Sequence, residues 1–225
     1  MIASDPAGPT LAVGDVNGDG LLDLVVTGTS AAPADRRLAV LLGDGHGGFS
    51  AARVMELPMF VLGQALGDVD GDGVLDVVLA GATDYSGTSM LQVLHGRGDG
   101  SFVLGPSVRA GPWLASAPQH LVALADLDGD GILDIVTPGP QPPDMGSPAA
   151  GPSPTLEVRR GTHDGTFGSA ETYPLDAHAS AVAVADVDLD GHPDVVAVGW
   201  IPGRVASVLF NHGDGRLGSP TYLPG

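Results

Sequence analysis

The chain has no cysteine and no lysine among its 225 residues, and only 4% of its residues are aromatic. Without cysteine, disulfides, thiol catalysis and thiolate metal sites are excluded. Without lysine, Schiff-base chemistry and a P-loop are excluded. The nine basic residues, all arginine, stand against 27 acidic ones, for a net charge of −18. Nucleic-acid binding needs a basic face, so it is not expected, and an anionic membrane surface is disfavoured for the same reason.

Long apolar runs and enzyme motifs are also missing. No apolar run reaches 18 residues, so no transmembrane span is expected. The first ten residues, MIASDPAGPT, lack the basic start and apolar stretch of a signal peptide, so we expect any export signal to be absent from this chain. Neither G-x-S-x-G nor H-E-x-x-H occurs. Because nothing marks a nucleophile with its base, we do not expect an enzyme.

What is present is a nine-residue acidic segment that occurs four times without gaps. The copies are DVNGDGLLD from Asp15, DVDGDGVLD from Asp68, DLDGDGILD from Asp126 and DVDLDGHPD from Asp186. Short apolar runs flank each copy, a third run and a glycine-rich turn follow, and a weaker fourth run ends the unit. Such runs, bounded by Gly, Asp and Pro, are typical of strands. Four strands per repeat predict an all-β fold, a β-propeller of four four-stranded blades; a solenoid of meanders is the alternative.

We expect residues 1–225 to form a single propeller domain, with blades at approximately 9–58, 59–110, 111–175 and 176–225. Each blade begins with its inner strand and ends with its outer one. No strand is therefore left over to latch the ring by completing another blade. Two closures remain open: a four-bladed ring within one chain, or a homodimer in which two chains form an eight-bladed ring and bury the open flanks.

The acidic segments have the spacing of a metal-binding loop. Oxygen-bearing side chains occupy positions 1, 3, 5 and 9, and position 6 is always glycine, which permits a sharp turn with positive φ. The chain can then fold back and offer the position-7 carbonyl. Five or six converging oxygens suit Ca²⁺, which accepts roughly 6–8. Ordinary Asp-Gly turns are the alternative, but two carboxylates about 4 Å apart repel by about 4 kcal/mol at an effective dielectric near 20.

We therefore predict about four Ca²⁺ ions, one in each loop. The fourth loop is the weakest candidate, because Leu189 replaces the glycine at position 4 and His192-Pro193 replaces two apolar residues. The predicted ligands, with the position-7 residue contributing its carbonyl, are Asp15, Asn17, Asp19, Leu21 and Asp23; Asp68, Asp70, Asp72, Val74 and Asp76; Asp126, Asp128, Asp130, Ile132 and Asp134; and Asp186, Asp188, Asp190, His192 and Asp194.

The pattern D-x-[DN]-x-D-G-x-x-D between two strands, followed by a glycine-rich turn ending in Phe, resembles the FG-GAP/VCBS repeats of integrin-α-type β-propellers. The resemblance spans nearly the whole chain. It implies calcium that stabilises the blades and a protein that binds proteins or glycans. It also implies an extracellular, cell-surface or periplasmic location.

The segments that vary most between repeats are expected at the end of the propeller opposite the acidic loops. Aromatic side chains in or beside them, Phe60 included, suit sugar rings or protein partners, unless they fill the seams between blades. The candidate ligand-binding residues are Tyr85, Trp113, His120, His178 and Trp200. Our interpretation is a non-catalytic, calcium-stabilised, lectin-like or adhesion module for a glycan or protein ligand. The alternatives are a propeller appendage of an exported hydrolase and a purely structural repeat fragment.

Overall fold

The computed structural model of the chain describes residues 9–28, 36–83, 89–110, 121–140, 153–201 and 204–224. These residues form sixteen strands and no helix. The strands assemble into four antiparallel sheets of four strands each, and in every sheet the strands are neighbours in the order in which they follow one another along the chain. The predicted all-β propeller of four four-stranded blades is therefore confirmed. Within the described part of the chain, no helix is long and apolar enough to cross a membrane.

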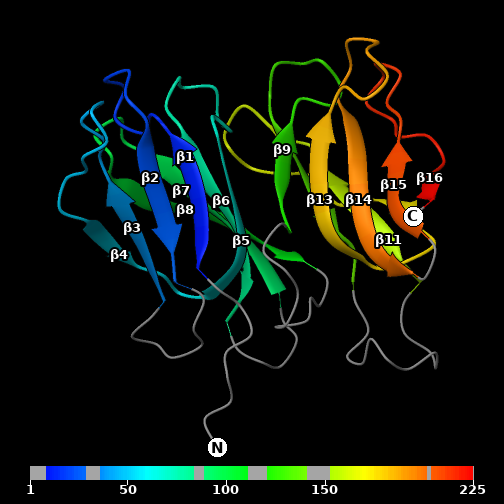
Figure 1. Cartoon of the computed structure of the whole chain (residues 1–225), viewed down its shortest axis with the longest axis horizontal. Coiled ribbons are helices and arrows are strands. Elements are labelled where there is room, and N and C mark those ends of the chain that lie inside the picture. Colours follow the sequence, from blue (N-terminus) through cyan, green and yellow to red (C-terminus); the bar gives the residue numbers. More distant parts are fainter. Residues whose placement is uncertain are drawn as a thin grey trace, which may run out of the picture.

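Each sheet is one blade, and each blade begins with the strand nearest the centre (Figure 1). The strands of blades 1 and 2 are β1 (Thr10–Gly14), β2 (Asp23–Thr27), β3 (Arg37–Leu41), β4 (Arg53–Glu56), β5 (Phe60–Gly67), β6 (Asp76–Ala82), β7 (Ser89–Gly96) and β8 (Phe102–Ala110). Those of blades 3 and 4 are β9 (Ala123–Ala125), β10 (Asp134–Pro138), β11 (Thr155–Arg159), β12 (Glu171–Pro174), β13 (Ala179–Ala185), β14 (Asp194–Ile201), β15 (Arg204–Leu209) and β16 (Thr221–Pro224).

The blades pack in chain order through their inner strands. β1 packs against β5, β5 against β9, and β9 and β10 against β13. No comparable packing joins β13 to β1 in the part of the chain that the structure describes. Blades 1 and 4 therefore each keep one face that no other blade covers in the described structure.

The hydrophobic core consists of three clusters, one in each seam between successive blades. Val25 and Val40 of blade 1 share a cluster with Val77 and Leu79 of blade 2, and the other two clusters join blades 2 and 3 and blades 3 and 4. Phe60 is only 2% exposed and lies in the cluster between blades 2 and 3. Of the two roles that the sequence left open for Phe60, the structure shows the seam-filling one, and burying this large apolar side chain there is worth about 1.5–3 kcal/mol.

Candidate metal centre

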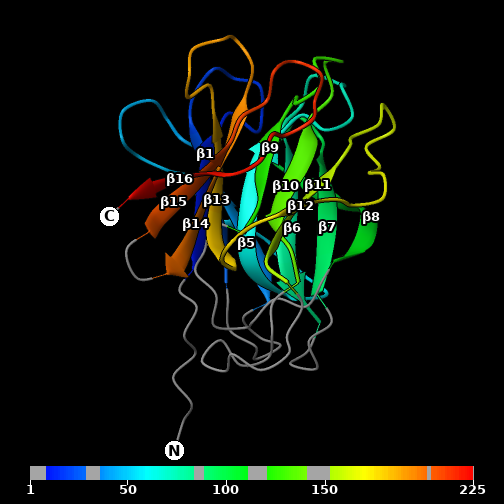
Figure 2. The same cartoon turned by 90° about the vertical axis from the view of Figure 1, so that its right-hand side faces the viewer.

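The four acidic loops connect the first and second strands of each blade and lie at one end of the propeller (Figures 1 and 2). They span residues 15–22, 68–75, 126–133 and 186–193, and we number them loops 1 to 4. In every blade the turn between the third and fourth strands lies at this same end, because the strands are antiparallel. The four acidic loops and the four glycine-rich turns therefore lie together at one end of the propeller.

The first Asp of each loop organises the turn by accepting backbone hydrogen bonds. Asp15 Oδ1 accepts the N–H of Gly18 at 2.7 Å, and its Oδ2 accepts the N–H of Gly20 at 2.7 Å. These bonds, that from Gly20 first, hold the pKa of Asp15 below its ordinary value. Both glycines have positive φ, 74° and 83°, which is the conformation that the loop requires of them. These bonds thus favour the ionised carboxylate, which is the form that can bind a cation.

Carboxylates from positions 1, 3 and 5 converge, as the spacing predicts. In loops 2 and 3 they offer oxygens that all lie within 4.8 Å of one another, and in loop 4 positions 1, 3 and 9 do so. Loop 1 has Asn17 at position 3, whose Nδ2 donates to Asp19 Oδ2 at 2.9 Å. The converging groups are Asp68, Asp70 and Asp72; Asp126, Asp128 and Asp130; and Asp186, Asp188 and Asp194.

The Asp at position 9 has a structural task that the sequence did not reveal. Asp23 is fully buried at the start of β2, where its Oδ2 accepts the N–H of Val16 at 3.0 Å and its Oδ1 accepts the N–H of Gly43 at 2.8 Å. The same pair of bonds recurs at Asp76, Asp134 and Asp194. This carboxylate therefore clamps the acidic loop to the end of the third strand, while its remaining lone pairs stay available to an ion.

The residue that receives this clamp is glycine in three blades for a steric reason. A Cβ on Gly43 would lie 2.2 Å from the carbonyl oxygen of Leu22, and Gly96 and Gly161 approach their loops in the same way. In blade 4 the position is Asn211, which keeps the backbone bond to Asp194 and adds one from its side chain: its Nδ2 donates to the carbonyl of Pro193 at 3.2 Å. The glycine that ends the third-strand run in three of the four repeats was the sequence signal for the clamp.

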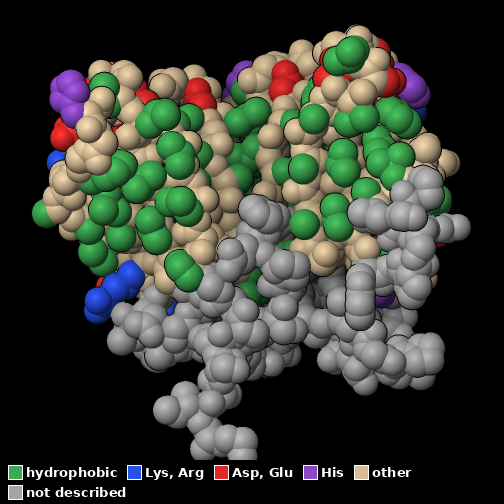
Figure 3. Space-filling model, in the orientation of Figure 1, with side chains coloured by type: hydrophobic (Ala, Val, Ile, Leu, Met, Phe, Trp, Pro, Cys, Tyr) green, Lys and Arg blue, Asp and Glu red, His purple; other side chains and the backbone are tan. Residues whose placement is uncertain are grey.

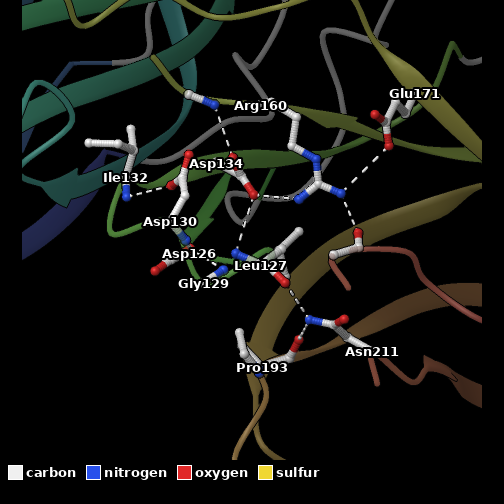
Figure 4. Close-up of polar contacts among 12 residues, drawn as sticks. Asp126, Leu127, Gly129, Asp130, Ile132, Asp134, Arg160, Glu171, Pro193 and Asn211 are labelled. Carbon is white, nitrogen blue, oxygen red and sulfur yellow. Dashed lines mark hydrogen bonds and ion pairs between the residues drawn. The ribbon is translucent and has the colours of Figure 1, made fainter. Parts of the chain in front are cut away.

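Two neighbouring side chains, His95 and Arg160, make loops 2 and 3 different from each other. His95 Nδ1 lies 3.2 Å from Asp70 Oδ2 and 3.6 Å from Asp76 Oδ1, so loop 2 has a nitrogen donor beside its carboxylates. In loop 3, the Arg160 guanidinium contacts Asp134 Oδ2 at 2.6 Å (Figure 4). Burial raises the pKa of Asp134, and the bonds from Gly161 and Arg160 oppose that rise. Sequence reasoning missed both side chains: His95 lies on β7, and Arg160 directly follows β11.

Loop 4 adopts the same backbone as the others without the glycine at position 4. Leu189 has φ of 64°, in the left-handed region that disfavours a branched side chain, and it is 85% exposed. Asp186 still accepts the N–H groups of Asp190 and Gly191 at 3.1 and 3.0 Å. Loop 4 therefore keeps the turn of the other loops, with local strain at Leu189; its weaker calcium binding stays a prediction.

Most of the candidate ligand-binding residues fall outside what the structure describes. Tyr85, Trp113 and His120 lie beyond the described residues, and so does the side chain of Trp200. His178 is half-buried directly before β13, and burial lowers its pKa. These assignments stay predictions.

A family model described as FG-GAP-like repeat matches residues 15–79 and again residues 68–137. Together the two matches span more than half of the chain and include loops 1 to 3. No curated protein sequence matches the chain.

Several solved structures share the fold at low sequence identity. One is the exotype rhamnogalacturonan lyase YesX, with a TM-score of 0.54 and 17% identity over 92% of this chain and 40% of the lyase. Another is rhamnogalacturonan lyase YesW, with a TM-score of 0.52 and 16% identity over 94% of this chain and 50% of the lyase. Rhamnogalacturonan lyase PL11 of Bacillus licheniformis is similar to the same degree, with a TM-score of 0.51 and 14% identity over 95% of this chain and 50% of the lyase. The chain thus spans half or less of the length of these enzymes, and the likeness concerns the fold alone.

Proposed function

The chain belongs to the FG-GAP-like repeat family, and from that premise we propose that residues 1–225 form a calcium-stabilised propeller that binds a glycan or protein ligand without catalysing a reaction. The observation that carries the proposal is the convergence of loop carboxylates, with oxygens within 4.8 Å of one another in loops 2, 3 and 4. Such groups repel one another unless a cation offsets their charge.

Calcium fits the donor set better than other common ions. The loops offer carboxylate, amide and backbone oxygens, which are hard ligands, and no thiolate, which zinc sites often use. The ion would supply positive charge that joins the two halves of each loop. The chain's own residues do the rest: position 1 orders the turn, the side chains at positions 3 and 5 would help to hold the ion, and position 9 fastens the loop to the third strand.

The four loops should differ in affinity. Arg160 already contributes positive charge beside Asp134 in loop 3, so we infer that this loop binds Ca²⁺ more weakly than loop 2. Extracellular calcium modules often bind at about 10⁻⁴–10⁻³ M. Affinities in that range would suit a protein that works at the cell surface, outside the cell or in the periplasm.

The structural neighbours suggest which ligand class to test first. Their names describe lyases of rhamnogalacturonan, a polysaccharide, so we propose a polysaccharide or a glycoprotein as the first probe. The second candidate role is that of a propeller appendage of an exported polysaccharide-degrading enzyme.

Thermal melts in Ca²⁺, Mg²⁺ and EDTA test the calcium part. We expect Ca²⁺ to raise the melting temperature and EDTA to lower it, and calorimetry to count about four ions. Asp72→Ala should reduce the calcium-dependent rise, whereas Asp99→Ala, at an exposed Asp of a neighbouring turn, should leave it intact. An identical melting curve in Ca²⁺ and EDTA would contradict the proposal.

A glycan array and a lyase assay test the remainder. Binding to a defined polysaccharide, including rhamnogalacturonan, with no release of unsaturated sugar supports the binding module. Turnover of any probe by the purified chain would refute the non-catalytic assignment.

A further inference from the structure

Two faces of the propeller are open: the face of blade 1 that points away from blade 2, and the face of blade 4 that points away from blade 3. Figure 3 shows hydrophobic side chains gathered over both blades on the same side of the molecule. Large exposed apolar patches mark interaction sites. Of the ten large apolar side chains that are exposed among the described residues, seven lie on these faces: Leu11, Val13, Leu22 and Val54 on blade 1, and Val187, Val198 and Leu223 on blade 4.

The open face of blade 1 corresponds, position by position, to a face that is buried on blade 2. Val77 of β6 is fully buried against blade 1, whereas its counterpart Leu24 on β2 is partly exposed. Gln64 of β5 donates to the carbonyl of Val25 in the preceding blade at 2.8 Å. Its counterpart on β1, Leu11, is 60% exposed. Blade 1 thus presents the surface of a blade whose preceding neighbour is missing.

The open face of blade 4 shows the complementary deficit. Position 2 of loops 1, 2 and 3 is Val16, Val69 or Leu127, each at most 1% exposed because the following blade covers it. The same position in loop 4 is Val187, which is 46% exposed. Blade 4 therefore presents the surface of a blade whose following neighbour is missing.

The turns between the third and fourth strands repeat this pattern at the metal-binding end. A Cβ on Gly100, Gly165 or Gly215 would approach the preceding blade to 2.8, 2.6 and 2.6 Å, so each of these turns lies tightly against its neighbour. The equivalent Gly47 of blade 1 has nothing within 4 Å of such a Cβ. Loops 1 to 3 each have the next blade's turn beside them, and loop 4 does not.

We propose that a second copy of the chain covers both open faces, so that two chains related by a two-fold axis close one ring of eight blades. The open face of blade 1 in each copy meets the open face of blade 4 in the other, which repeats twice the packing already seen in the three seams within the chain. Such an interface is closed and self-complementary, and eight blades lie within the range of known propellers. The turn of blade 1, residues 43–49, then lies beside loop 4 of the other copy.

Light scattering in calcium, with one charged substitution on each open face, tests the proposal. The wild-type protein in solution should have twice the mass of one chain, which is 22.5 kDa. Val13→Glu and Val198→Glu, at side chains 52% and 39% exposed, should each reduce the mass to that of one chain. Leu104→Glu is the matched control, because Leu104 is 53% exposed but lies on β8 of blade 2, away from both open faces, and it should leave the dimer intact. A monomeric wild type, or a dimer that both substitutions leave unchanged, overturns the proposal.

A direct fusion of two copies provides a test that does not depend on whether the charged variants fold. In the fusion, residue 225 of the first copy and residues 1–9 of the second would link β16 to β1. This linker is longer than the three residues, 57–59, that link β4 to β5 within the chain. Because both seams close within one fused molecule, it should keep the mass of two chains and associate no further. If the wild type dimerises through another surface, the fusion would associate to four chains or more, and the eight-bladed ring would be refuted.

Discussion

Replacing Asp23 with alanine should destabilise the protein even when no metal is present. The carboxylate is fully buried and is the acceptor for two backbone N–H groups, those of Val16 at 3.0 Å and Gly43 at 2.8 Å. Alanine leaves both donors unpaired, that of Val16 buried and that of Gly43 partly buried, and each such loss costs about 1–3 kcal/mol. We therefore expect the free energy of unfolding to fall by about 2–6 kcal/mol, a large part of the roughly 5–15 kcal/mol that a typical domain has.

Asp44→Ala is the matched control, because Asp44 Oδ1 also accepts two backbone N–H groups, from His46 and Gly48, both at 2.8 Å. Asp44 is exposed, so water can replace its carboxylate and the loss should be smaller. Urea unfolding in EDTA measures both variants. At a slope of about 2–3 kcal/mol/M, the midpoint of Asp23→Ala should fall by about 1–3 M. Equal losses for the two variants would refute the idea that burial makes position 9 a clamp.

Three further substitutions or measurements examine single loops. Leu189→Gly should stabilise the protein by about 0.5–1.5 kcal/mol, since a non-glycine residue pays about 1–2 kcal/mol in the left-handed region and glycine recovers most of it; an unchanged or lower urea midpoint would contradict the strain at φ 64°. Arg160→Leu should tighten calcium binding at loop 3, and calorimetry would show one site of higher affinity. Hydrogen bonds from Thr166 and Thr162 lower the pKa of Asp164 to about 2. The contribution of Asp164 to stability should therefore be complete above about pH 4 and lost as the pH falls through about 2. An NMR titration in which this carboxyl group titrates near pH 4 would contradict the prediction.

The blades and their acidic loops could be predicted because each repeat carries its own local instructions. Gly20 and its counterparts permit the positive φ of the turn, and the first Asp of each loop bonds to N–H groups only three to five residues away. Such short-range chemistry can be recognised in a nine-residue pattern. Four copies then indicate the propeller, since a single blade cannot bury its faces alone.

The roles that depend on distant partners were beyond the sequence. Asp23 receives its second hydrogen bond from Gly43, 20 residues away, and Arg160 meets Asp134 across 26 residues. Equivalent positions in the other blades hold residues as different as leucine and phenylalanine, namely Leu42 and Phe210. Because the repeat does not keep this position constant, no sequence pattern predicted that His95 and Arg160 would lie beside loops 2 and 3.

Closure of the ring differs from these cases, because the sequence pattern predicts buried faces that remain exposed in the structure of a single chain. The apolar runs of β1 and β2 are similar to those of β5 and β6, and such continuous runs predict strands that are buried on both faces. In blade 2 the face toward blade 1 is covered, with Val77 fully buried, whereas in blade 1 Leu11 and Val13 remain 60% and 52% exposed. A repeat that encodes burial on both faces of every blade leaves two faces unsatisfied in a row of four packed blades. Two such rows joined end to end leave none, and this is the physical reason to expect a second copy at the open faces.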